Sequence, residues 1–386
     1  MGLNVSELNE VLTVHAKHIG VLDVKADIDV LSRQDLGRAY TPGVAELSKI
    51  IEKNPELKDK YTISGKLIAV VTDGSAVLGL GNIGTAAGLP IVEGKSLLYK
   101  DLADVNAIPV AIDQVPVDEF VRTIKNFSKT FAGIHLEDIA APRCFEIEES
   151  LKNVLDIPVY HDDQEGTAIV VLAGLINAAK VVGKELSDLR IVINGIGAAG
   201  VATARLLFSI GIRNLVLVDI HGVVRADDLN YNHFQRDLAR EINLNTDGQS
   251  LDDVIDDQDV FVGLSDAHVL SAAQVKRMAQ NPIIFALANP LPEIEPQVAA
   301  NAGAKVIATG SAQYANQVNN VLVFPGLYKG LLNSGIKQVD YRIEKIVAEA
   351  LASMVEKPTF DHIVPGVFEK GVVNTVSTAL ERSLVR

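Results

Sequence analysis

The stretch LRIVINGIGAAGVATARLLFSIGIRNLVLVD, residues 189–219, decides the fold of this chain. A β-branched run leads directly into the glycines of GIGAAG, residues 195–200, and a segment with helical composition follows them. A second apolar run then ends in Asp219, 24 positions after Gly195. A strand, a glycine turn, a helix and a second strand ending in an acid are the parts of a dinucleotide-binding βαβ unit. The stretch therefore predicts a Rossmann-type nucleotide site.

Each small residue of GIGAAG has a separate expected role in that unit. Gly195 makes the turn, Gly197 lets the backbone approach the phosphates, and Gly200 permits close packing of helix on strand. The amides of Ala198 and Ala199 open the helix and point at the pyrophosphate. A structural turn without a ligand is the alternative interpretation.

Asp219 predicts which dinucleotide is preferred. Its carboxylate accepts hydrogen bonds from ribose hydroxyls and repels a 2′-phosphate, which favours NAD over NADP. His221 and Arg225 are the nearby residues that could partly reverse this preference, so NADP is kept as the alternative.

A second glycine pattern, GLGNIG at residues 79–84, has the same spacing without the same surroundings. An extra turn separates it from the run KLIAVVTDG, and Pro90 and Gly94 are expected to interrupt the helix that should follow. We interpret it as a tight loop beside a reacting centre, or as plain turn chemistry.

Short β-branched runs alternate with helix-length segments along most of the chain, which predicts an α/β fold with mostly parallel sheets. Two domains are expected: an N-terminal α/β substrate and catalytic domain over 1–160, and a doubly wound, Rossmann-type NAD(P)-binding domain over 161–386. The helical segments after residue 337 could pack back on the first domain or against a second subunit. The predicted strands lie at 66–74, 107–113, 156–163, 189–195, 214–219, 259–265, 283–290 and 304–310.

The composition excludes several classes of function. A formal net charge of −14 over 386 residues argues against nucleic-acid or anionic-membrane binding. The apolar run at 167–179 is shorter than the roughly 18 residues that span a bilayer, so a buried helix is expected there. The N-terminal segment has no basic start or apolar core typical of secretion, which predicts a cytoplasmic protein. Cys144 is the single cysteine, so it forms no intrachain disulfide and is expected to be a quiet thiol.

Two acidic pairs follow apolar runs, Glu137-Asp138 in HLEDIAAP and Asp162-Asp163 in VYHDDQEGT. The ends of parallel strands share one edge of a sheet, so these carboxylates are expected to converge and to bind Mg²⁺ or Mn²⁺. Alternatively, Asp163 caps a helix that begins near Gln164, and Glu137-Asp138 is a solvated corner.

Lys95 and Tyr40 are the candidates for proton transfer. Lys95 lies in a mostly apolar helical segment, EGKSLLYK, where partial burial would depress its pKa and make it a base. Tyr40 precedes a Pro-Gly turn in GRAYTPGVA, where a phenol can be held as an acid. A solvent-facing lysine and a packed tyrosine ring are the alternatives.

Taken together, these stretches resemble the malic enzymes, in particular their short bacterial form. The resemblance covers roughly residues 33 to 330, in the family's order. It implies divalent-metal-dependent oxidative decarboxylation of (S)-malate to pyruvate and CO₂ with reduction of NAD or NADP. It rests on YTPGVA, VTDGSAVLGLGNIG, PIVEGKSLLYK, HLEDIAAP, HDDQEGTA, INGIGAAG, ALANPLPE and NQVNNVLVFPG.

The resemblance also implies roles for individual residues. Lys95 is similar to the base that takes the C2 hydroxyl proton, and Tyr40 to the acid that protonates C3 of enolpyruvate. Asn289 resembles a residue that contacts both malate and the cofactor, and Asn320, with Asn319 less firmly, resembles a residue that positions malate carboxylates. The implied metal ligands are Glu137, Asp138 and Asp163, with Asp162 beside them as a supporting group.

Two features separate this chain from the family pattern or leave its reaction open. Larger members have a carboxylate-binding arginine where this chain has Ala76, so charge complementarity to malate must come from elsewhere. A malolactic reaction that releases lactate without net NADH, and a non-catalytic nucleotide sensor, are the alternative functions. The resemblance implies a homodimer or higher homo-oligomer.

Overall fold

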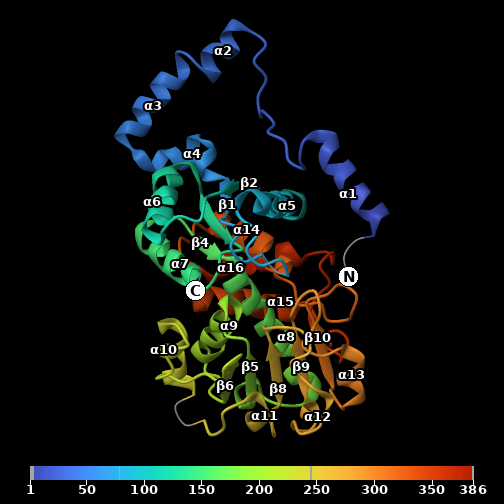
Figure 1. Cartoon of the computed structure of the whole chain (residues 1–386). Coiled ribbons are helices and arrows are strands. Elements are labelled where there is room, and N and C mark those ends of the chain that lie inside the picture. The colour runs from blue at the N-terminus through green and yellow to red at the C-terminus, as the bar shows by residue number, and fades with distance from the viewer. Residues whose placement is uncertain (1–3, 78, 244–245, 385–386) are drawn as a thin grey trace.

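Two parallel sheets, one above the other in Figure 1, form the body of the molecule. The structure is a computed structural model and describes residues 4–77, 79–243 and 246–384. The first sheet precedes the second in the chain, and helices cover both. This is the α/β, two-sheet architecture that the sequence predicts.

The first sheet has four strands in the order β2-β1-β3-β4, all parallel. Every residue of β1 is buried, as expected of a central strand covered on both faces. The register pairs Thr72 with Glu137 and Leu136 with His161, so the acids that follow β3 and β4 emerge at one edge. The strands are β1 (Leu67–Thr72), β2 (Asn106–Ala111), β3 (Gly133–Glu137) and β4 (Val159–His161), connected through α5 (Thr85–Ala103), α6 (Val117–Phe127), η3 (Ser128–Thr130) and α7 (Arg143–Val154).

The second sheet has the order β10-β9-β8-β5-β6-β7, and only β7 is antiparallel among its described strands. The chain moves outward on opposite sides of β5, toward β6 and toward β8, which makes β5 the switch point where doubly wound folds bind nucleotides. The strands are β5 (Ile191–Asn194), β6 (Leu215–Asp219), β7 (Gly222–Val223), β8 (Val260–Gly263), β9 (Ile283–Ala286) and β10 (Val306–Thr309). The other elements are η5 (Leu186–Asp188), α9 (Ala198–Ser209), α10 (His233–Ile242), α11 (Leu251–Val254), α12 (Ala272–Val275) and α13 (Pro296–Asn301).

The predicted strands are all present, and their ends differ from the predicted ends by at most four residues. Two further strands, β3 and β7, were missing from the predicted set. The run GIHLE of β3 contains His135 and Glu137 among apolar residues. A search for continuous apolar, β-branched runs therefore misses it, although every residue of the strand is buried.

The expected buried helix at 167–179 is α8 (Thr167–Val182), which follows a short π-helical turn, η4 (Asp162–Gly166). The whole segment Asp162–Val182 is long and apolar enough to cross a membrane, but it is mostly buried inside the protein. The helix packs against α9 and α15 (Tyr341–Ser353). It is therefore best described as a core helix.

The expected interruption at Pro90 and Gly94 is wrong, because α5 is one continuous helix from Thr85 to Ala103. Pro90 lies in its second turn, where it removes one backbone hydrogen bond at a cost of about 3 kcal/mol. Burial of Val92 and Tyr99 on the same helix stabilises it against that loss.

The last helices pack back on their own chain. Helix α14 (Phe324–Ser334) contacts α5, and the hydroxyl of Tyr328 donates a 2.5 Å hydrogen bond to the carbonyl of Ile134 in β3. Helix α16 (Val372–Ser383) packs on α14 and α15. The helices after η6 (Asn320–Leu322) therefore lie against the first sheet and α8, near the junction of the two sheets (Figure 1).

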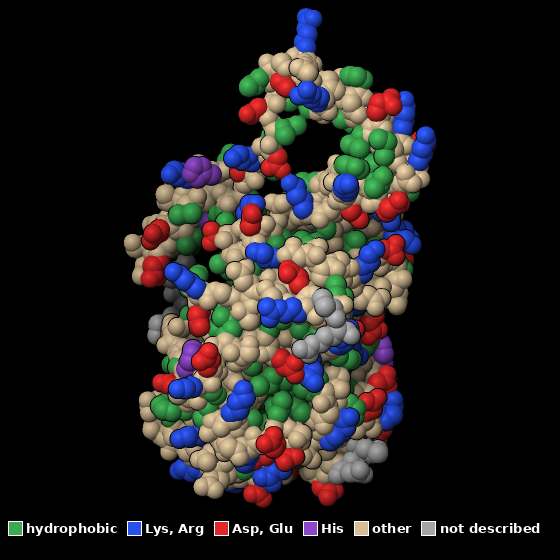
Figure 2. Space-filling model, turned by 180° about the vertical axis from the view of Figure 1, so that it is seen from behind, with side chains coloured by type: hydrophobic (Ala, Val, Ile, Leu, Met, Phe, Trp, Pro, Cys, Tyr) green, Lys and Arg blue, Asp and Glu red, His purple; other side chains and the backbone are tan. Residues whose placement is uncertain are grey.

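Residues 4–54 form an arm that projects from this body. It contains α1 (Val5–His18), α2 (Arg33–Ala39) and α3 (Gly43–Lys53), and none of these helices has a buried residue. The arm returns to the first sheet through η1 (Pro55–Leu57), α4 (Lys58–Tyr61) and η2 (Ile63–Gly65). Figure 1 places α2 and α3 at the end of the molecule opposite the second sheet, and Figure 2 shows hydrophobic side chains exposed around them.

Candidate active site

Lys95 meets the acids of the first sheet at the carboxyl ends of β3 and β4. Its side chain is 14% exposed, and its Nζ lies 3.1 Å from Oε2 of Glu137. The same ammonium forms an ion pair with Asp162 and lies 3.4 Å from Oδ1 of Asn320. Helix α5, two strand ends and the η6 turn thus bring together residues that are up to 225 positions apart.

The electrostatics of Lys95 differ from the sequence expectation. Burial alone would lower the pKa of Lys95, but the carboxylates of Asp162, Glu137 and Asp163 raise it above its ordinary value. The expectation of a depressed pKa is wrong, because three nearby negative charges together outweigh the desolvation of one ammonium.

Glu137, Asp138 and Asp163 form a compact cluster whose ligand atoms all lie within 4.8 Å of one another. Burial and mutual repulsion raise the pKa of Glu137 to about 7 and the pKa values of Asp138 and Asp163 to about 8. Buried carboxylates that repel one another are stabilised by a cation, and oxygen donors suit Mg²⁺ or Mn²⁺. The cluster therefore fits the predicted metal.

The two alternative interpretations of these acids do not match the structure. Glu137 and Asp138 are buried rather than solvated. Asp163 does not cap a helix with its side chain, because neither η4 nor α8 has a side-chain cap hydrogen bond. Its Oδ2 instead accepts a 2.8 Å hydrogen bond from the amide of Asp138.

Asp162 is held by protein groups on both carboxylate oxygens. The hydroxyl of Tyr160 donates a 2.5 Å hydrogen bond to Oδ1, and Lys95 pairs with Oδ2. Asp162 is fully buried, so it orients the lysine from behind rather than facing the cavity.

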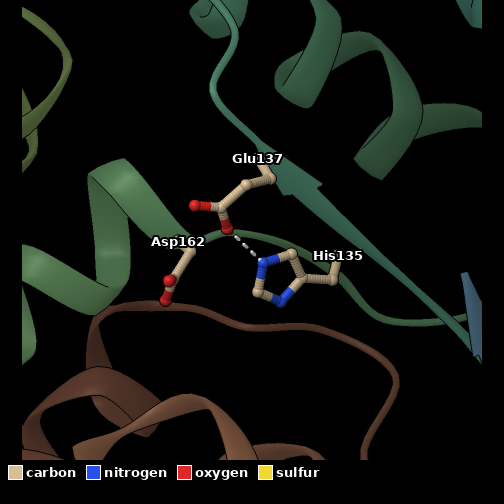
Figure 3. Close-up of side chains that lie close together, drawn as sticks. All are labelled: His135, Glu137 and Asp162. Carbon is tan, nitrogen blue, oxygen red and sulfur yellow. Dashed lines mark hydrogen bonds and ion pairs between the residues drawn. The ribbon is translucent and has the colours of Figure 1, made fainter. Parts of the chain in front are cut away.

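His135 belongs to the site but was not among the predicted residues. Its Nε2 lies 2.7 Å from Oε2 of Glu137 (Figure 3). Its Nδ1 lies 2.8 Å from the hydroxyl of Tyr99. Burial lowers the pKa of His135 to about 3, so the ring is neutral. Donation from Nε2 to the carboxylate and acceptance from Tyr99 at Nδ1 is the tautomer that satisfies all three groups.

A second possible metal cluster, His135 with Glu137 and Asp162, is less suitable than the first. Both ring nitrogens of His135 and both oxygens of Asp162 already have protein partners. The signal that could have identified His135 is its spacing, since residues two apart on a strand point to the same face.

The π-helical turn that carries Asp163 is anchored by a buried ion-pair network. Lys152 lies 2.5 Å from Glu148 and 2.6 Å from Glu165, and Glu165 also accepts a 2.7 Å hydrogen bond from the amide of His161. Gln164 donates a 2.6 Å hydrogen bond to Glu148. These contacts hold the turn on α7 and leave Asp163 facing the cluster.

A cavity of about 510 Å³ lies between the acids of the first sheet and the switch point of the second. Asp163 borders it on one side, and the N-terminus of α9 borders it on the other. Its described lining comprises Ala76, Ile139, Ala140, Ala141, Asp163, Thr167, Val170, Gly197, Ala198, Ala199, Leu264, Ser265, Leu287, Ala288, Asn289, Gly310, Val318, Asn319 and Asn320.

The glycines of GIGAAG have the geometry of a nucleotide cradle. Gly195 has φ +99°, and a side chain there would meet the backbone of Leu264 at 2.5 Å. A Cβ on Gly200 would lie 1.9 Å from the carbonyl oxygen of Gly195, so helix and turn pack as closely as predicted. A Cβ on Gly197 would meet no protein atom within 4 Å, which leaves room for a phosphate at the start of α9.

Asp219 lies at the carboxyl end of a strand beside the GIGAAG turn. Asp219 ends β6, next to the Gly195 turn, whose amide bonds the carbonyl of Val218 at 2.8 Å. The guanidinium of Arg225 donates to the backbone carbonyls of Thr246 and Gly248. These two hydrogen bonds hold the guanidinium of Arg225 against the backbone of the loop before α11.

The three predicted asparagines all line the cavity. Asn320 contacts Lys95, as described above, and Asn289 lies against Gly310. Asn319 accepts a 3.0 Å hydrogen bond from the amide of Val321, so part of its side chain caps η6.

The GLGNIG loop also lies at the cavity. A Cβ on Gly79 would lie 3.5 Å from the carbonyl oxygen of Asn289, and Ala76, just before the loop, lines the cavity. Its last glycine directly precedes α5, which carries Lys95. The loop is therefore a turn near the cavity that leads into α5.

Tyr40 is a predicted site residue that lies apart from both the acid cluster and the described lining of the cavity. It lies between α2 and α3 in the arm, with 67% of its surface exposed. Cys144, by contrast, is fully buried, and burial raises the pKa of its thiol, which makes it unreactive.

Comparison with known proteins was consistent across both halves of the chain. The family models "Malic enzyme, N-terminal domain" and "Malic enzyme, NAD binding domain" match residues 24–152 and 164–383. The NAD-dependent malic enzyme of Geobacillus stearothermophilus is 44% identical over 96% of this chain and 78% of its own length.

Two further relatives extend this comparison. The bifunctional malic/malolactic enzyme of Bacillus subtilis is 45% identical over 97% of this chain and 92% of its own. The crystal structure of the NAD-dependent malic enzyme of Thermotoga maritima has a TM-score of 0.92 and 37% identity, and the match covers 98% of this chain and 99% of that one.

Proposed function

This chain belongs to the malic enzyme family, and on that premise we propose that it oxidatively decarboxylates (S)-malate with NAD and a divalent cation, using Lys95 and Tyr40. Family membership makes the chain an oxidoreductase rather than a non-catalytic nucleotide sensor. The contact of Lys95 with Glu137 and Asp162, at the edge of a cavity bordered by the α9 cradle, is the observation that carries the proposal.

Lys95 takes the proton from the C2 hydroxyl of malate. In the arrangement described above, its pKa is raised because three carboxylates surround it. Once the charge of Glu137 and Asp163 is neutralised, that attraction weakens while the burial of the lysine remains, so its pKa falls toward the range of a working base. Asp162, fixed by Tyr160, holds the amine through an ion pair.

Glu137, Asp138 and Asp163 are the residues that would hold the cation, and the α9 N-terminus with Gly197 would hold the pyrophosphate. When bound, Mg²⁺ or Mn²⁺ supplies stabilisation of negative charge on substrate oxygens, and NAD supplies the hydride acceptor. His135 positions Glu137 by donating a hydrogen bond to its carboxylate.

Asn289 and Asn320 face the same cavity and are the proposed contacts to malate. Their amide groups donate hydrogen bonds to carboxylate oxygens without adding charge. NAD is preferred over NADP because Asp219 repels a 2′-phosphate and Arg225 is held by backbone carbonyls.

A malolactic outcome is the second candidate function. The relative from Bacillus subtilis is named a bifunctional malic/malolactic enzyme, and the site described here contains no feature that separates release of pyruvate from its reduction to lactate. We propose a cytoplasmic homo-oligomer for either reaction, consistent with the burial of the apolar helix α8.

The test is a product balance on the purified protein supplied with (S)-malate, NAD and Mn²⁺. We expect NADH, pyruvate and CO₂ in equal amounts, with activity lost on chelation and restored by Mn²⁺. Lactate without net NADH would assign the malolactic reaction instead. Activity that is insensitive to chelator would show that the reaction does not need a divalent cation.

A further inference from the structure

A second cavity, of about 190 Å³, lies where helix α7, the turn η4, helix α9 and the start of α15 meet. None of its described lining residues also lines the cavity of the candidate active site. At a share of about 30 Å³ for each water molecule, the space would hold roughly six waters. The second cavity is therefore large enough for a small organic molecule and is separate from the site of the proposed reaction.

Glu344 borders this cavity as a buried carboxylate with no partner of its own. Only 4% of its surface is exposed, and its side chain forms no hydrogen bond or ion pair with any described residue. The two other buried glutamates in the wall are satisfied, because Glu148 and Glu165 lie 2.5 and 2.6 Å from Nζ of Lys152. Buried polar side chains normally have a hydrogen-bond partner. Glu344 is therefore the group to which a ligand in this cavity would bind.

The wall of the cavity carries a surplus of negative charge. Five of the described lining residues are acids and two are bases. Both bases have acidic partners, since Lys152 pairs as described above and Nη1 of Arg205 lies 3.6 Å from Oε1 of Glu149. Because a negative wall attracts cations and repels anions, the ligand that it favours is a cation.

The chemistry of the wall favours an organic ammonium ion over a bare metal ion. Of the described residues, the two groups with converging metal-ligand atoms both lie beside Lys95, and neither includes an acid of this cavity. A divalent cation needs several such ligands. Aromatic faces attract organic cations, and apolar side chains pack against their carbon atoms. The aromatic and apolar members of the wall are Phe145, Ala202, Val339 and Tyr341.

Tyr341 is the aromatic residue best placed to contact such a cation. The ring of Phe145 is already engaged, because the guanidinium of Arg205 lies 5.9 Å from its centroid and the ring of Phe234 lies 4.9 Å from it. The ring of Tyr341 has no cationic or aromatic neighbour at such distances in the described part of the chain. Tyr341 and Glu344 are three residues apart on α15, so their side chains lie on the same face of the helix.

We propose that this cavity binds a small organic ammonium ion between the carboxylate of Glu344 and the ring of Tyr341. The ammonium group donates charge-assisted hydrogen bonds to the carboxylate, and its carbon atoms lie against the apolar part of the wall. A ligand held here lies against η4, the turn that also carries Asp163. The inference does not depend on the proposed function, because binding requires neither malate nor NAD.

Ionisation of Glu344 sets the pH range of binding. Burial raises the pKa of Glu344 to about 8, with repulsion from Glu165 and Asp340 added and attraction to Lys152 opposing. A protonated carboxyl forms no ion pair, whereas an alkylammonium, like lysine, stays charged to about pH 10, so the affinity should rise from about pH 7 to about pH 8.5. Burial also raises the pKa of Tyr341, so its phenol stays neutral in this range. The other charged groups that border the cavity are Glu148, Glu149, Lys152, Glu165, Arg205 and Asp340.

A ligand-detected NMR titration of the full-length protein with ethylammonium chloride tests the proposal. Ethylammonium has one charged donor group and a two-carbon chain, so it probes both parts of the site. The titration is run at about pH 8.5, without malate, NAD or added metal, and NaCl holds the ionic strength constant. We expect saturable binding with a dissociation constant in the millimolar range, since so small a ligand gains little free energy.

Two variants separate the parts of the site. Glu344→Gln keeps the shape of the side chain and removes its charge, so the affinity should fall by about tenfold or more. Tyr341→Leu keeps an apolar side chain and removes the ring, so the affinity should fall by about two- to tenfold. Glu349→Gln, an exposed change on the same helix outside the cavity, should bind ethylammonium as wild type does. Thermal unfolding of each variant separates a lost ligand contact from a lost fold.

Several results would overturn the inference. The wild-type protein could show no saturable binding, or folded Glu344→Gln could bind ethylammonium as tightly as wild type does. Displacement of ethylammonium by an equal concentration of KCl or MnCl₂ would identify a site for inorganic cations instead. An affinity that falls between about pH 7 and about pH 8.5 would contradict the part given to Glu344.

Discussion

Replacing Glu344 by glutamine should stabilise the protein in a pH-dependent manner. Glu344 lies on α15 with 4% of its surface exposed. Burial raises the pKa of Glu344 to about 8, with repulsion from Glu165 and Asp340 added and attraction to Lys152 opposing. The folded protein therefore keeps this carboxyl protonated at pH values where the unfolded chain has released the proton.

The sign and size of the effect follow from proton linkage. Between the unfolded pKa of 4.5 and the folded value of about 8, the folded state binds more protons, so stability falls as pH rises. Each pH unit of that interval corresponds to about 1.4 kcal/mol, which sets a ceiling of about 5 kcal/mol for a group titrating alone. Because Glu344 interacts with the charges of Glu165, Asp340 and Lys152 rather than titrating alone, we expect roughly 2 to 3 kcal/mol.

Glutamine has the shape and neutrality of the protonated acid. Urea unfolding at one protein concentration, from about pH 5 to about pH 8, should give wild type and Glu344→Gln similar stability at the acid end. The variant should become progressively more stable than wild type toward pH 8. Glu349→Gln, an exposed change on the same helix, should follow the wild-type curve. A stability difference that is constant with pH, or that grows toward acid, would refute the reasoning.

Three further predictions concern the ligand sites. Mn²⁺ should raise the Tm of wild type and of the control variant Glu349→Gln. It should not raise the Tm of Asp163→Asn, because that change removes one of three clustered ligands. A rise in the Tm of Asp163→Asn as large as that of wild type would contradict the assignment. Asp219→Asn keeps an acceptor for the amide of Ile220 while removing the charge, so its ratio of kcat/KM for NADP over NAD should rise by at least about tenfold; an unaltered ratio would count against Asp219. In Gly197→Ala the added Cβ meets no protein atom within 4 Å, so the variant should keep the wild-type Tm. The same Cβ occupies the space proposed for the phosphate, so the affinity for NAD, measured by titration, should fall by about tenfold or more. Gly200→Ala places a Cβ 1.9 Å from the carbonyl oxygen of Gly195 and should lower Tm. A lowered Tm with unchanged NAD affinity in Gly197→Ala, together with an unchanged Tm in Gly200→Ala, would contradict the assignment of the nucleotide site.

Much of the fold could be predicted because its signals are local. The β5–α9–β6 unit follows from contiguous residues, since the strand, the glycines and the acid each have a fixed place in the sequence. The convergence of Glu137, Asp138 and Asp163 also follows from a local rule, because parallel strands end at a common edge.

Other features depend on three-dimensional context that no local pattern contains. In the sequence, His135 interrupts an apolar run. Only the fold shows that Tyr99 and Glu137 provide hydrogen-bond partners for both of its ring nitrogens. The raised pKa of Lys95 depends on three carboxylates from two other segments of the chain. The continuity of α5 through Pro90 depends on packing that outweighs one lost hydrogen bond.

The placement of Tyr40 follows neither from a local sequence pattern nor from packing within the described chain. The pattern YTPG marks the residue, but the structure leaves it 67% exposed and outside the described lining of the cavity. Its role in the reaction therefore stays a prediction.

The central claim is that Lys95 removes the C2 hydroxyl proton, and the two halves of the reaction test it most directly. Oxidation of malate needs that base, whereas decarboxylation of the corresponding 2-keto acid, oxaloacetate, does not, because no hydroxyl proton remains. With Mn²⁺ present, Lys95→Met should lose NADH formation from malate by about 10²- to 10⁴-fold while retaining oxaloacetate decarboxylation. Lys100→Met, an exposed change on the same helix, should retain both. Malate oxidation by Lys95→Met at the wild-type rate would contradict the account.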